Sequence, residues 1–306
     1  MRGLASLGAL KYLETRTELC KFHTFIGSSI GSVICSFLNI KVPIDEIYTF
    51  FLSLNPENVA KFHISKITTQ FGLDSGINFV WLVKQVLVKH GYDENVTFAD
   101  LFEKTEKKLV ITGTNVNTHS IEYFDYESSP RLRIVDAIRI SISVPFIFTA
   151  PLYKGCYYVD GGVLDNFPLH LTNNENHKEV LAIKLGHTKH IHPINNCVQN
   201  LEDFSMNLLQ TMLDEIEYLR NKECTQILND SQILHIDTKD YSSFTFNLQL
   251  AQKQELFKMG YDAAAAFHRE PKEPEETQNG ESVIDSPVID SPVIDSESDD
   301  GSKLPT

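Results

Sequence analysis

The sequence predicts an α/β layered fold, because stretches with strand character alternate with stretches of helical spacing along most of the chain. Of the 306 residues 42% are hydrophobic, which is enough for a sizeable core. A largely apolar run at 179–185 is typical of a strand in the middle of a parallel sheet. We therefore expect one α/β domain over residues 1–268.

The expected elements follow one another in a regular order. Strands are predicted where β-branched and aromatic residues gather, at 22–26, 108–116, 120–126, 179–185 and 232–236. Helices are predicted where apolar residues recur at helical spacing, at 4–13, 30–39, 42–54, 78–90, 97–102, 134–143, 205–224 and 248–268. The stretch 61–76 has no clean period and is predicted to be a loop or a lid.

After His268 the pattern ends, and residues 269–306 are predicted to form a disordered acidic tail. The run Val-Ile-Asp-Ser occurs three times from Val283 on, and a short repeat with Pro and Asp cannot bury a core. Two interpretations of the repeats stay open. They are a solubilising segment, or they contact a protein partner by adding a strand to its sheet or after phosphorylation at Ser286 and Ser291.

Charge and cysteine content exclude several classes of protein. Residues 270–306 hold eleven acidic residues against two lysines, so most of the formal charge of −14 lies there and the body is only mildly acidic. No basic stripe is present, and we expect no nucleic-acid partner. The five cysteines are widely spaced, odd in number and without a C-x-x-C pair, which argues against a zinc site or a disulfide framework. No metal and no cofactor are expected.

The same features indicate where the protein resides. Widely spaced cysteines suit the reduced interior of a cell, and the first residues lead into an amphipathic run rather than a secretory signal. The longest apolar stretch, 25–42, is interrupted by Gly and Ser residues, which favours a buried helix over a membrane span. We expect a cytoplasmic protein that is soluble or peripherally associated with a membrane surface.

The run Gly27-Ser28-Ser29-Ile30-Gly31 is the strongest functional signal. A Gly-x-Ser-x-Gly pentapeptide between a strand and a helix presents its serine on a sharp turn, where small flanking residues let the helix pack back on the strand. Ser29 would then lie at a helix N-terminus, whose N–H groups stabilise negative charge on a bound acyl group. Ser29 is the candidate nucleophile.

A serine nucleophile needs a base, and no histidine stands in a recognisable setting. His187, His190 and His192 form a loop cluster at most. Downstream lies Asp160-Gly161-Gly162, whose glycines would let the backbone turn sharply. In an ordinary α/β-hydrolase several strands also precede the sharp turn that carries the nucleophile, whereas only twenty-eight residues precede Ser29.

Several motifs in the same order resemble the patatin-like phospholipase family. They are Arg2-Gly3-Leu4 with Leu7-Gly8-Ala9-Leu10, the pentapeptide around Ser29, Ile111-Thr112-Gly113-Thr114-Asn115, the run 141–148, and Asp160-Gly161-Gly162-Val163 with Asn166 and Pro168 nearby. The similarity spans residues 1–268. It implies a three-layer fold with a central, mostly parallel sheet flanked by helices, and a lipid acyl hydrolase that acts on phospholipids or related acyl esters.

The resemblance also implies a two-residue mechanism. Ser29 would be the nucleophile and Asp160 the base, without a histidine, and the reaction would pass through an acyl-enzyme. The family places a strand and a Gly-Gly-Gly-x-Arg/Lys-Gly run before its first helix, and the N–H groups of that run form the oxyanion hole. Only Arg2 and Gly3 correspond to it here. We therefore expect the natural chain to begin upstream of Met1.

Two further hypotheses remain at this point. The first is a catalytically impaired relative that binds lipid or protein, motivated by the incomplete oxyanion run. The second is a histidine-dependent esterase, which would lose activity in one His→Ala variant and tolerate Asp160→Asn.

Overall fold

The computed structural model describes residues 1–16, 19–54, 67–172, 179–186, 201–224, 233–238 and 248–268, together with the single residues 198 and 241. Contacts divide the chain into two units, Met1–Glu270 and Pro271–Thr306, and everything reported below lies in the first. The predicted tail and its repeats lie outside the described residues, as do His187, His190 and His192.

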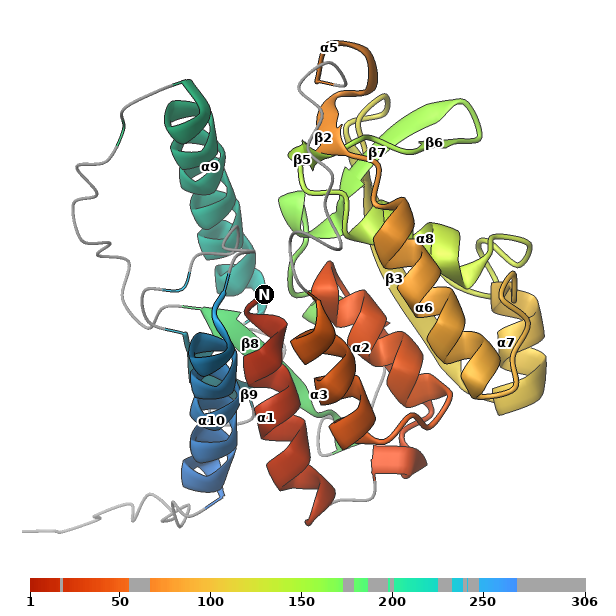
Figure 1. Ribbon diagram of the computed structural model, residues 1–306, viewed down its shortest axis with the longest axis vertical. Helices are drawn as coiled ribbons and strands as arrows, with labels where there is room; N and C mark the ends of the chain where they lie inside the picture. Colours follow the sequence, from red (N-terminus) through yellow and green to blue (C-terminus); the bar gives the residue numbers. More distant parts are fainter. Residues whose placement is uncertain are drawn as a thin grey trace, which may run out of the picture. The chain divides into compact units, whose positions relative to one another are not determined.

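The described part of the chain is a mixed α/β structure with a central sheet flanked by helices, as the sequence predicts (Figure 1). The sheets are built from β1 (Thr24–Gly27), β2 (Gly72–Asp74), β3 (Lys108–Asn115), β4 (Ser120–Phe124), β5 (Phe146–Phe148), β6 (Leu152–Tyr153), β7 (Cys156–Asp160), β8 (Ala182–Gly186) and β9 (Ile233–Asp237). The helices are α1 (Gly3–Glu14), α2 (Ile30–Asn39), α3 (Ile44–Ser53), α5 (Ile67–Gln70), α6 (Ile77–Lys89), α7 (Phe98–Thr105), α8 (Ile134–Ser141), α9 (Leu201–Cys224) and α10 (Leu250–Phe267).

Strand β3 organises the central sheet. It is parallel to β1, with Gly27 opposite Ile111, and antiparallel to both β4 and β7. The first half of β3 therefore has a parallel neighbour and its second half has antiparallel ones. Because β6 also pairs with β7 in antiparallel fashion, this sheet has, within the described residues, one parallel and three antiparallel pairings, and is not mostly parallel as expected. The pairs β2–β5 and β8–β9 are separate and parallel. Because β1 and β7 both pair with β3, the last residue of β1, Gly27, and the last residue of β7, Asp160, lie opposite residues of β3 that are only two positions apart.

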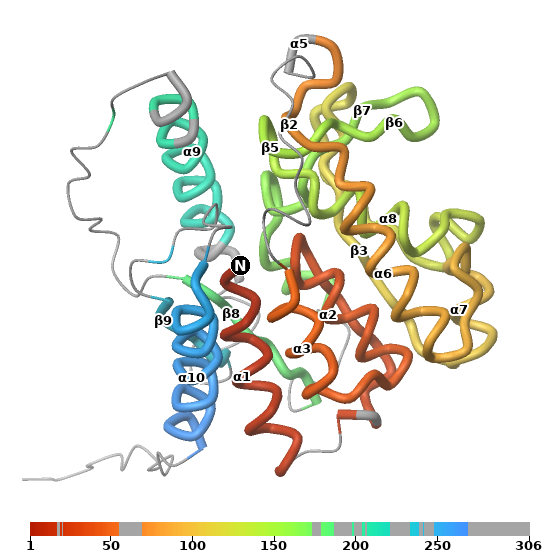
Figure 2. The backbone as a smooth tube through the Cα atoms, in the orientation of Figure 1, coloured from red at the N-terminus to blue at the C-terminus, as the bar shows by residue number. Residues whose placement is uncertain are grey.

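Helices cover the sheet as their apolar faces require. Helix α2 packs on β1 and β3, α8 packs on β3 and β7, and α1 and α10 pack against each other and against the β8–β9 pair. The tube trace shows α1 and α10 side by side (Figure 2). Gly8 and Gly260 make this contact close, because a Cβ at Gly8 would lie 1.8 Å from the carbonyl oxygen of Phe257, and one at Gly260 would lie 1.7 Å from that of Ala5.

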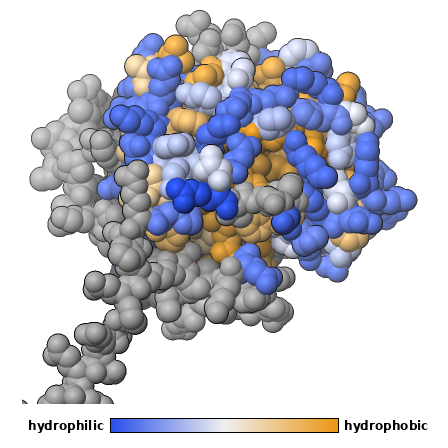
Figure 3. Space-filling view, turned by 90° about the horizontal axis from the view of Figure 1, so that it is seen from below, coloured by the Kyte–Doolittle hydropathy of each residue, from blue (hydrophilic) through white to orange (hydrophobic). Residues whose placement is uncertain are grey.

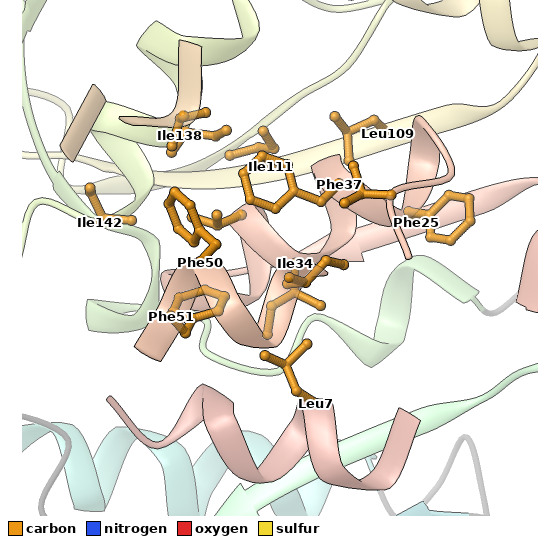
Figure 4. Packing of buried hydrophobic residues seen from close by; sticks show 14 of the residues in the cluster. Leu7, Phe25, Ile34, Phe37, Phe50, Phe51, Leu109, Ile111, Ile138 and Ile142 are labelled. Carbon is orange, nitrogen blue, oxygen red and sulfur yellow. The ribbon is translucent and has the colours of Figure 1, made fainter. Parts of the chain in front are cut away.

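One hydrophobic cluster joins these layers. Figure 4 shows Phe37 of α2 between Leu109 and Ile111 of β3 and the aromatic residues of α3. Phe50 contacts Phe37 edge to face, with ring centroids 5.2 Å apart, which is a favourable aromatic geometry. Seen from below, hydrophilic residues cover much of the surface, and hydrophobic ones show between them toward the middle (Figure 3).

The prediction of a loop or lid at 61–76 is wrong where the structure describes that stretch. Residues 67–70 form the short helix α5 and 72–74 form β2, whereas 61–66 lie outside the described residues. Strand β2 pairs with β5, more than seventy positions later in the sequence. A three-residue strand with so distant a partner has no local pattern that the sequence could reveal.

A buried lysine ties α10 to α3. The Lys253 side chain is only 2% exposed, and its Nζ donates to the carbonyl oxygens of Leu52 (3.0 Å) and Leu54 (2.7 Å). These carbonyls lie at the C-terminal end of α3, where backbone acceptors lack helical partners and positive charge is favoured. Burial lowers the pKa of Lys253, but the helix end supplies the acceptors that its ammonium group needs.

We predict that Lys253→Met lowers the free energy of unfolding by about 2 kcal/mol, because buried carbonyls lose their donor while the aliphatic stem is kept. Urea unfolding followed by circular dichroism measures the change. Lys258→Met is the matched control, since Lys258 is exposed on the same helix, and its effect should stay within about 0.5 kcal/mol. Equal stability of the two variants would contradict the role of Lys253.

Candidate active site

Ser29 lies on a strained turn between β1 and α2. Its backbone has φ 52° and ψ −128°, a combination that a residue with a side chain rarely adopts. Ser29 is also the residue immediately before α2, which begins at Ile30. The strand, the turn and the helix therefore occur where the pentapeptide predicts them, and the positive end of the α2 dipole is directed at Ser29.

The two glycines of the pentapeptide have different roles. A Cβ at Gly27 would lie 2.4 Å from the carbonyl oxygen of Gly31, so the return of α2 over β1 requires glycine at position 27. A Cβ at Gly31 would have no heavy atom within 4 Å. The expected need for a small residue on both sides of the serine therefore holds in these contacts for Gly27 alone.

Asp160 ends β7 with its carboxyl group against Ser29. The Ser29 hydroxyl donates to Oδ2 at 2.6 Å, and the Gly162 N–H donates to Oδ1 at 2.7 Å. Asp160 is 5% exposed, whereas Ser29 is half-buried. The structure thus brings together the two residues that the sequence singles out, although 131 positions separate them.

The backbone of Asp160 is fixed on both sides. Its N–H donates to the carbonyl oxygen of Ser143 (2.8 Å), and its carbonyl oxygen accepts from the Thr114 hydroxyl (3.0 Å). A Cβ at Gly161 would lie 2.0 Å from Oγ1 of Thr112. Gly161 and Gly162 form a 3₁₀ turn without positive φ. Gly161 is therefore needed for space against β3, and the expected sharp turn does not depend on an unusual backbone angle.

Two hydroxyl groups with no role predicted from the sequence hold the turn at Ser29. The Ser141 hydroxyl accepts the N–H of Ser29 at 3.0 Å, and the Thr112 hydroxyl donates to Oγ of Ser28 at 2.8 Å. Both belong to motifs that carry the family resemblance. The predicted helix 134–143 ends at Ser141, and the carbonyl oxygen of Ser143, two residues beyond it, accepts the N–H of Asp160.

Burial changes the acidity of Asp160. Desolvation raises its pKa from 3.8 to about 7, and the hydrogen bonds from Ser29 and Gly162 oppose that rise. A carboxyl group with a pKa near neutrality can accept a proton and return it within one cycle. The site therefore has a hydroxyl on a strained turn in contact with a carboxylate of suitable basicity.

Arg139 on α8 connects this site to the β2–β5 pair. Its guanidinium donates to the carbonyl oxygens of Ser75 (2.8 Å) and Thr149 (2.6 Å) and to the hydroxyl of Ser143. Burial lowers the pKa of Arg139 to about 10, so it remains a cation. The residue whose carbonyl holds Asp160 is thus tied to the segments that contain β2 and β5.

The residues expected to contribute to the oxyanion hole, Arg2 and Gly3, lie beside the first residue of α2. Arg2 precedes α1 and Gly3 begins it, and a Cβ at Gly3 would lie 2.6 Å from Cγ2 of Ile30. Burial lowers the pKa of Arg2, and the negative charges of Glu217 and Asp214 on α9 oppose this lowering. The start of α1 therefore lies against the first residue of α2, next to Ser29.

Histidines and metal ligands do not join the site in the part of the chain that the structure describes. The histidines with side-chain partners there include His90, which contacts Glu46, and His170, whose Nδ1 lies 3.6 Å from Asp165. Within the described ranges no group of three or more His, Cys, Asp or Glu side chains could hold a metal ion. Over the same ranges, no helix is both long and apolar enough to cross a membrane.

Comparison with known proteins finds similarity to lipid-hydrolysing proteins. Residues 1–172 match the model of the family described as patatin-like phospholipase. A probable lipid hydrolase of Invertebrate iridescent virus 6 is 34% identical over 183 residues, which cover 58% of this chain and 62% of that protein. The chain thus spans less than two thirds of the length of this relative.

Two other similarities cover more of the chain. An uncharacterized protein of Acanthamoeba polyphaga mimivirus is 29% identical over 269 residues, or 84% of this chain and 87% of that one. The crystal structure of VipD from Legionella pneumophila superposes with a TM-score of 0.51 at 16% identity, covering 87% of this chain and 64% of that chain. At this identity the likeness shows a shared fold.

We predict that Asp160→Asn alters how stability depends on pH. The native carboxyl group binds its proton up to a pH of about 7, and the unfolded one releases it near 3.8, so native stability falls as pH rises between these values. Relative to Asp160→Asn, the wild-type chain should lose up to about 4 kcal/mol of unfolding free energy across this range.

Urea unfolding at a series of pH values measures this difference. Asp262→Asn, at an exposed position of α10, is the control and should keep the wild-type profile. Parallel profiles of the wild-type chain and Asp160→Asn would show that the carboxyl group of Asp160 titrates at an ordinary pH.

Proposed function

Because the chain belongs to the patatin-like phospholipase family, we propose that it hydrolyses acyl esters of lipids, with Ser29 as nucleophile and Asp160 as base. The observation that carries the proposal is the 2.6 Å hydrogen bond from the strained Ser29 to the buried Asp160. We assign the activity to residues 1–268. Phospholipids are the proposed substrate class, supported by the family and by the viral lipid hydrolase that the chain resembles.

The first half of the proposed reaction forms an acyl-enzyme. Oγ of Ser29 attacks the ester carbonyl carbon while its proton passes to Oδ2 of Asp160. The tetrahedral intermediate then collapses, the bond to the leaving oxygen breaks, and Asp160 returns the proton to that oxygen, which departs as an alcohol or a lysophospholipid. The Gly162 N–H on Oδ1 keeps the other carboxyl oxygen turned away from the serine throughout.

The second half releases the fatty acid. Water takes the place of the leaving alcohol, gives a proton to Asp160 and attacks the acyl carbon. Collapse of the second intermediate returns that proton to Oγ of Ser29 and frees a carboxylic acid. Negative charge on the intermediates lies at the N-terminal end of α2, with the start of α1 beside it. We propose Arg2 and Gly3 as contributors to this oxyanion region.

We predict that Ser29→Ala lowers hydrolysis of a short p-nitrophenyl ester and of a phospholipid by at least about 10³-fold. Asp160→Asn should lower it by about 10²- to 10⁴-fold, because the base is lost and the amide oxygen can accept only one of the two hydrogen bonds that the carboxyl group accepts. Ser120→Ala in β4 is the matched serine control and should keep wild-type rates. Activity that survives Ser29→Ala would overturn the assignment.

A fluorophosphonate probe separates the enzyme from a non-catalytic lipid- or protein-binding relative. The probe phosphonylates only an activated serine, whose Oγ bonds to phosphorus as fluoride leaves, and we expect one label per chain, on the peptide that contains Ser29. Labelling should disappear in Ser29→Ala and persist in His170→Ala, because Ser29 and its base Asp160 do not use the histidine. An unlabelled wild-type chain would favour the binding protein, and loss of labelling in His170→Ala would favour a histidine-dependent esterase.

A further inference from the structure

Strands β2, β5, β6 and β7 lie together at the top of the view in Figure 1. Five exposed apolar side chains belong to these strands or to residues directly beside them and beside the end of β3. We call this set the apolar rim: Phe71, Val116, Phe146, Leu152 and Tyr157, each between 39% and 62% exposed. Large apolar side chains exposed singly are common, but a contiguous group of them indicates a contact surface.

Strand register places three members of the rim in one row. Tyr157 of β7 lies opposite Leu152 of β6. On its other side, the Val116 N–H donates to the Tyr157 carbonyl oxygen at 2.9 Å, which extends the β3–β7 register by one pair. Residues directly opposite each other on neighbouring strands project to the same face of a sheet. Val116, Tyr157 and Leu152 therefore form one continuous apolar row.

The other two members join this row through the β2–β5 pair. The ring of Phe71 meets the ring of Tyr157 edge to face, with centroids 5.3 Å apart, and the next residue, Gly72, pairs with Phe146. Phe71 and Phe146 both have positive φ, 64° and 68°. A bulky residue in this region is strained, so the surrounding structure must hold the backbone of both half-exposed aromatic residues in this conformation.

The charges around the rim favour a lipid surface. Segments 67–73, 114–119 and 144–159 contain no acidic residue, although the chain as a whole carries a formal charge of −14. Lys154 and Gly155 form the two-residue turn between β6 and β7, both with positive φ, and the Lys154 ammonium lies 5.0 Å from the Tyr153 ring centre. A cation beside exposed aromatic and aliphatic side chains suits the boundary between anionic headgroups and acyl chains.

The rim includes a residue of β7, the strand that ends at Asp160 of the proposed active site. Tyr157 and Asp160 lie on the same strand, three residues or about 10 Å apart, and their side chains project to opposite faces of it. Phe146 follows Ser143 by three residues, and Arg139 ties Ser143 to Ser75 and Thr149, which flank β2 and β5. A surface that engages the rim is thus held at a short, fixed distance from the carboxyl group.

From this geometry we propose that the apolar rim docks the chain on the surface of a phospholipid bilayer, with Lys154 contacting anionic headgroups, and delivers substrate to Ser29. This inference rests on the proposed lipid hydrolase function and names the surface through which it acts. The rim side chains enter the headgroup boundary, and the hydrophobic effect with the attraction of Lys154 holds them there.

Binding is measured by co-sedimentation with phosphatidylcholine vesicles that contain or lack phosphatidylserine. The Ser29→Ala chain is used, so the vesicles are not hydrolysed and binding is scored independently of catalysis. Adding Phe71→Ser with Leu152→Ser should weaken binding at least about tenfold on both vesicles. Adding Lys154→Glu alone should weaken binding chiefly to the vesicles with phosphatidylserine. Val88→Ser, at an exposed apolar position on the last turn of α6, is the control and should bind as its parent does.

A second readout uses the same rim variants with Ser29 intact. They should lose vesicle phospholipid hydrolysis while keeping hydrolysis of a soluble p-nitrophenyl ester within about twofold, which also shows that they fold. Vesicle binding unchanged in both rim variants, or absent in the parent chain, would overturn the proposal and leave the rim as a protein contact. Failure of fluorophosphonate labelling would instead overturn the hydrolase, while the binding result would stand on its own.

Discussion

The hydrogen bond between Ser29 and Asp160 is the contact on which the rest of the site depends. To form it, the chain must bring the end of β7 against the turn after β1 and bury a carboxyl group there. Two backbone contacts on the way are closer than a side chain would allow. Gly27 meets the backbone of Gly31 within the turn, and Gly161 meets Thr112 of β3. Strand β3 lies between the two segments, pairs with both and supplies the hydroxyls that set their spacing.

This arrangement is unfavourable for the native state, and the surrounding structure compensates for it. Ser29 has a strained backbone, and an ionised Asp160 is desolvated. The packing of α2 and α8 on β3, the close contact of α1 with α10 and the ties made by Lys253 and Arg139 hold the two segments in register. The proposed function and the stability of the fold thus make opposing demands at one carboxyl group.

Much of the fold was predictable because its elements carry local patterns. The spacing of apolar residues located α2 at its observed bounds, 30–39, and the capped helix near Thr97 is present as α7 with its capping box. Ser29 and Asp160 could both be singled out as candidates because each sits in a short motif of characteristic residues. The family resemblance joined them, since nothing local in the sequence connects position 29 with position 160.

The parts that escaped prediction depend on distant partners. Strands β2 and β5 have three residues each and exist through their mutual pairing and the hydrogen bonds of Arg139. The roles of Ser141, Ser143 and Thr114 likewise arise from where folding places their polar atoms. The apolar rim follows from strand register, so its five members, scattered between positions 71 and 157, show no common pattern in the sequence.

The rate at which a fluorophosphonate labels Ser29, measured across pH, tests the central claim most directly. If the buried Asp160 is the base, the labelling rate should rise about tenfold for each pH unit below a pH of about 7 and level off above it, as the carboxyl group ionises. In Asp160→Asn this dependence should vanish along with most of the rate. A midpoint near pH 4, or the same profile in Asp160→Asn, would contradict the account.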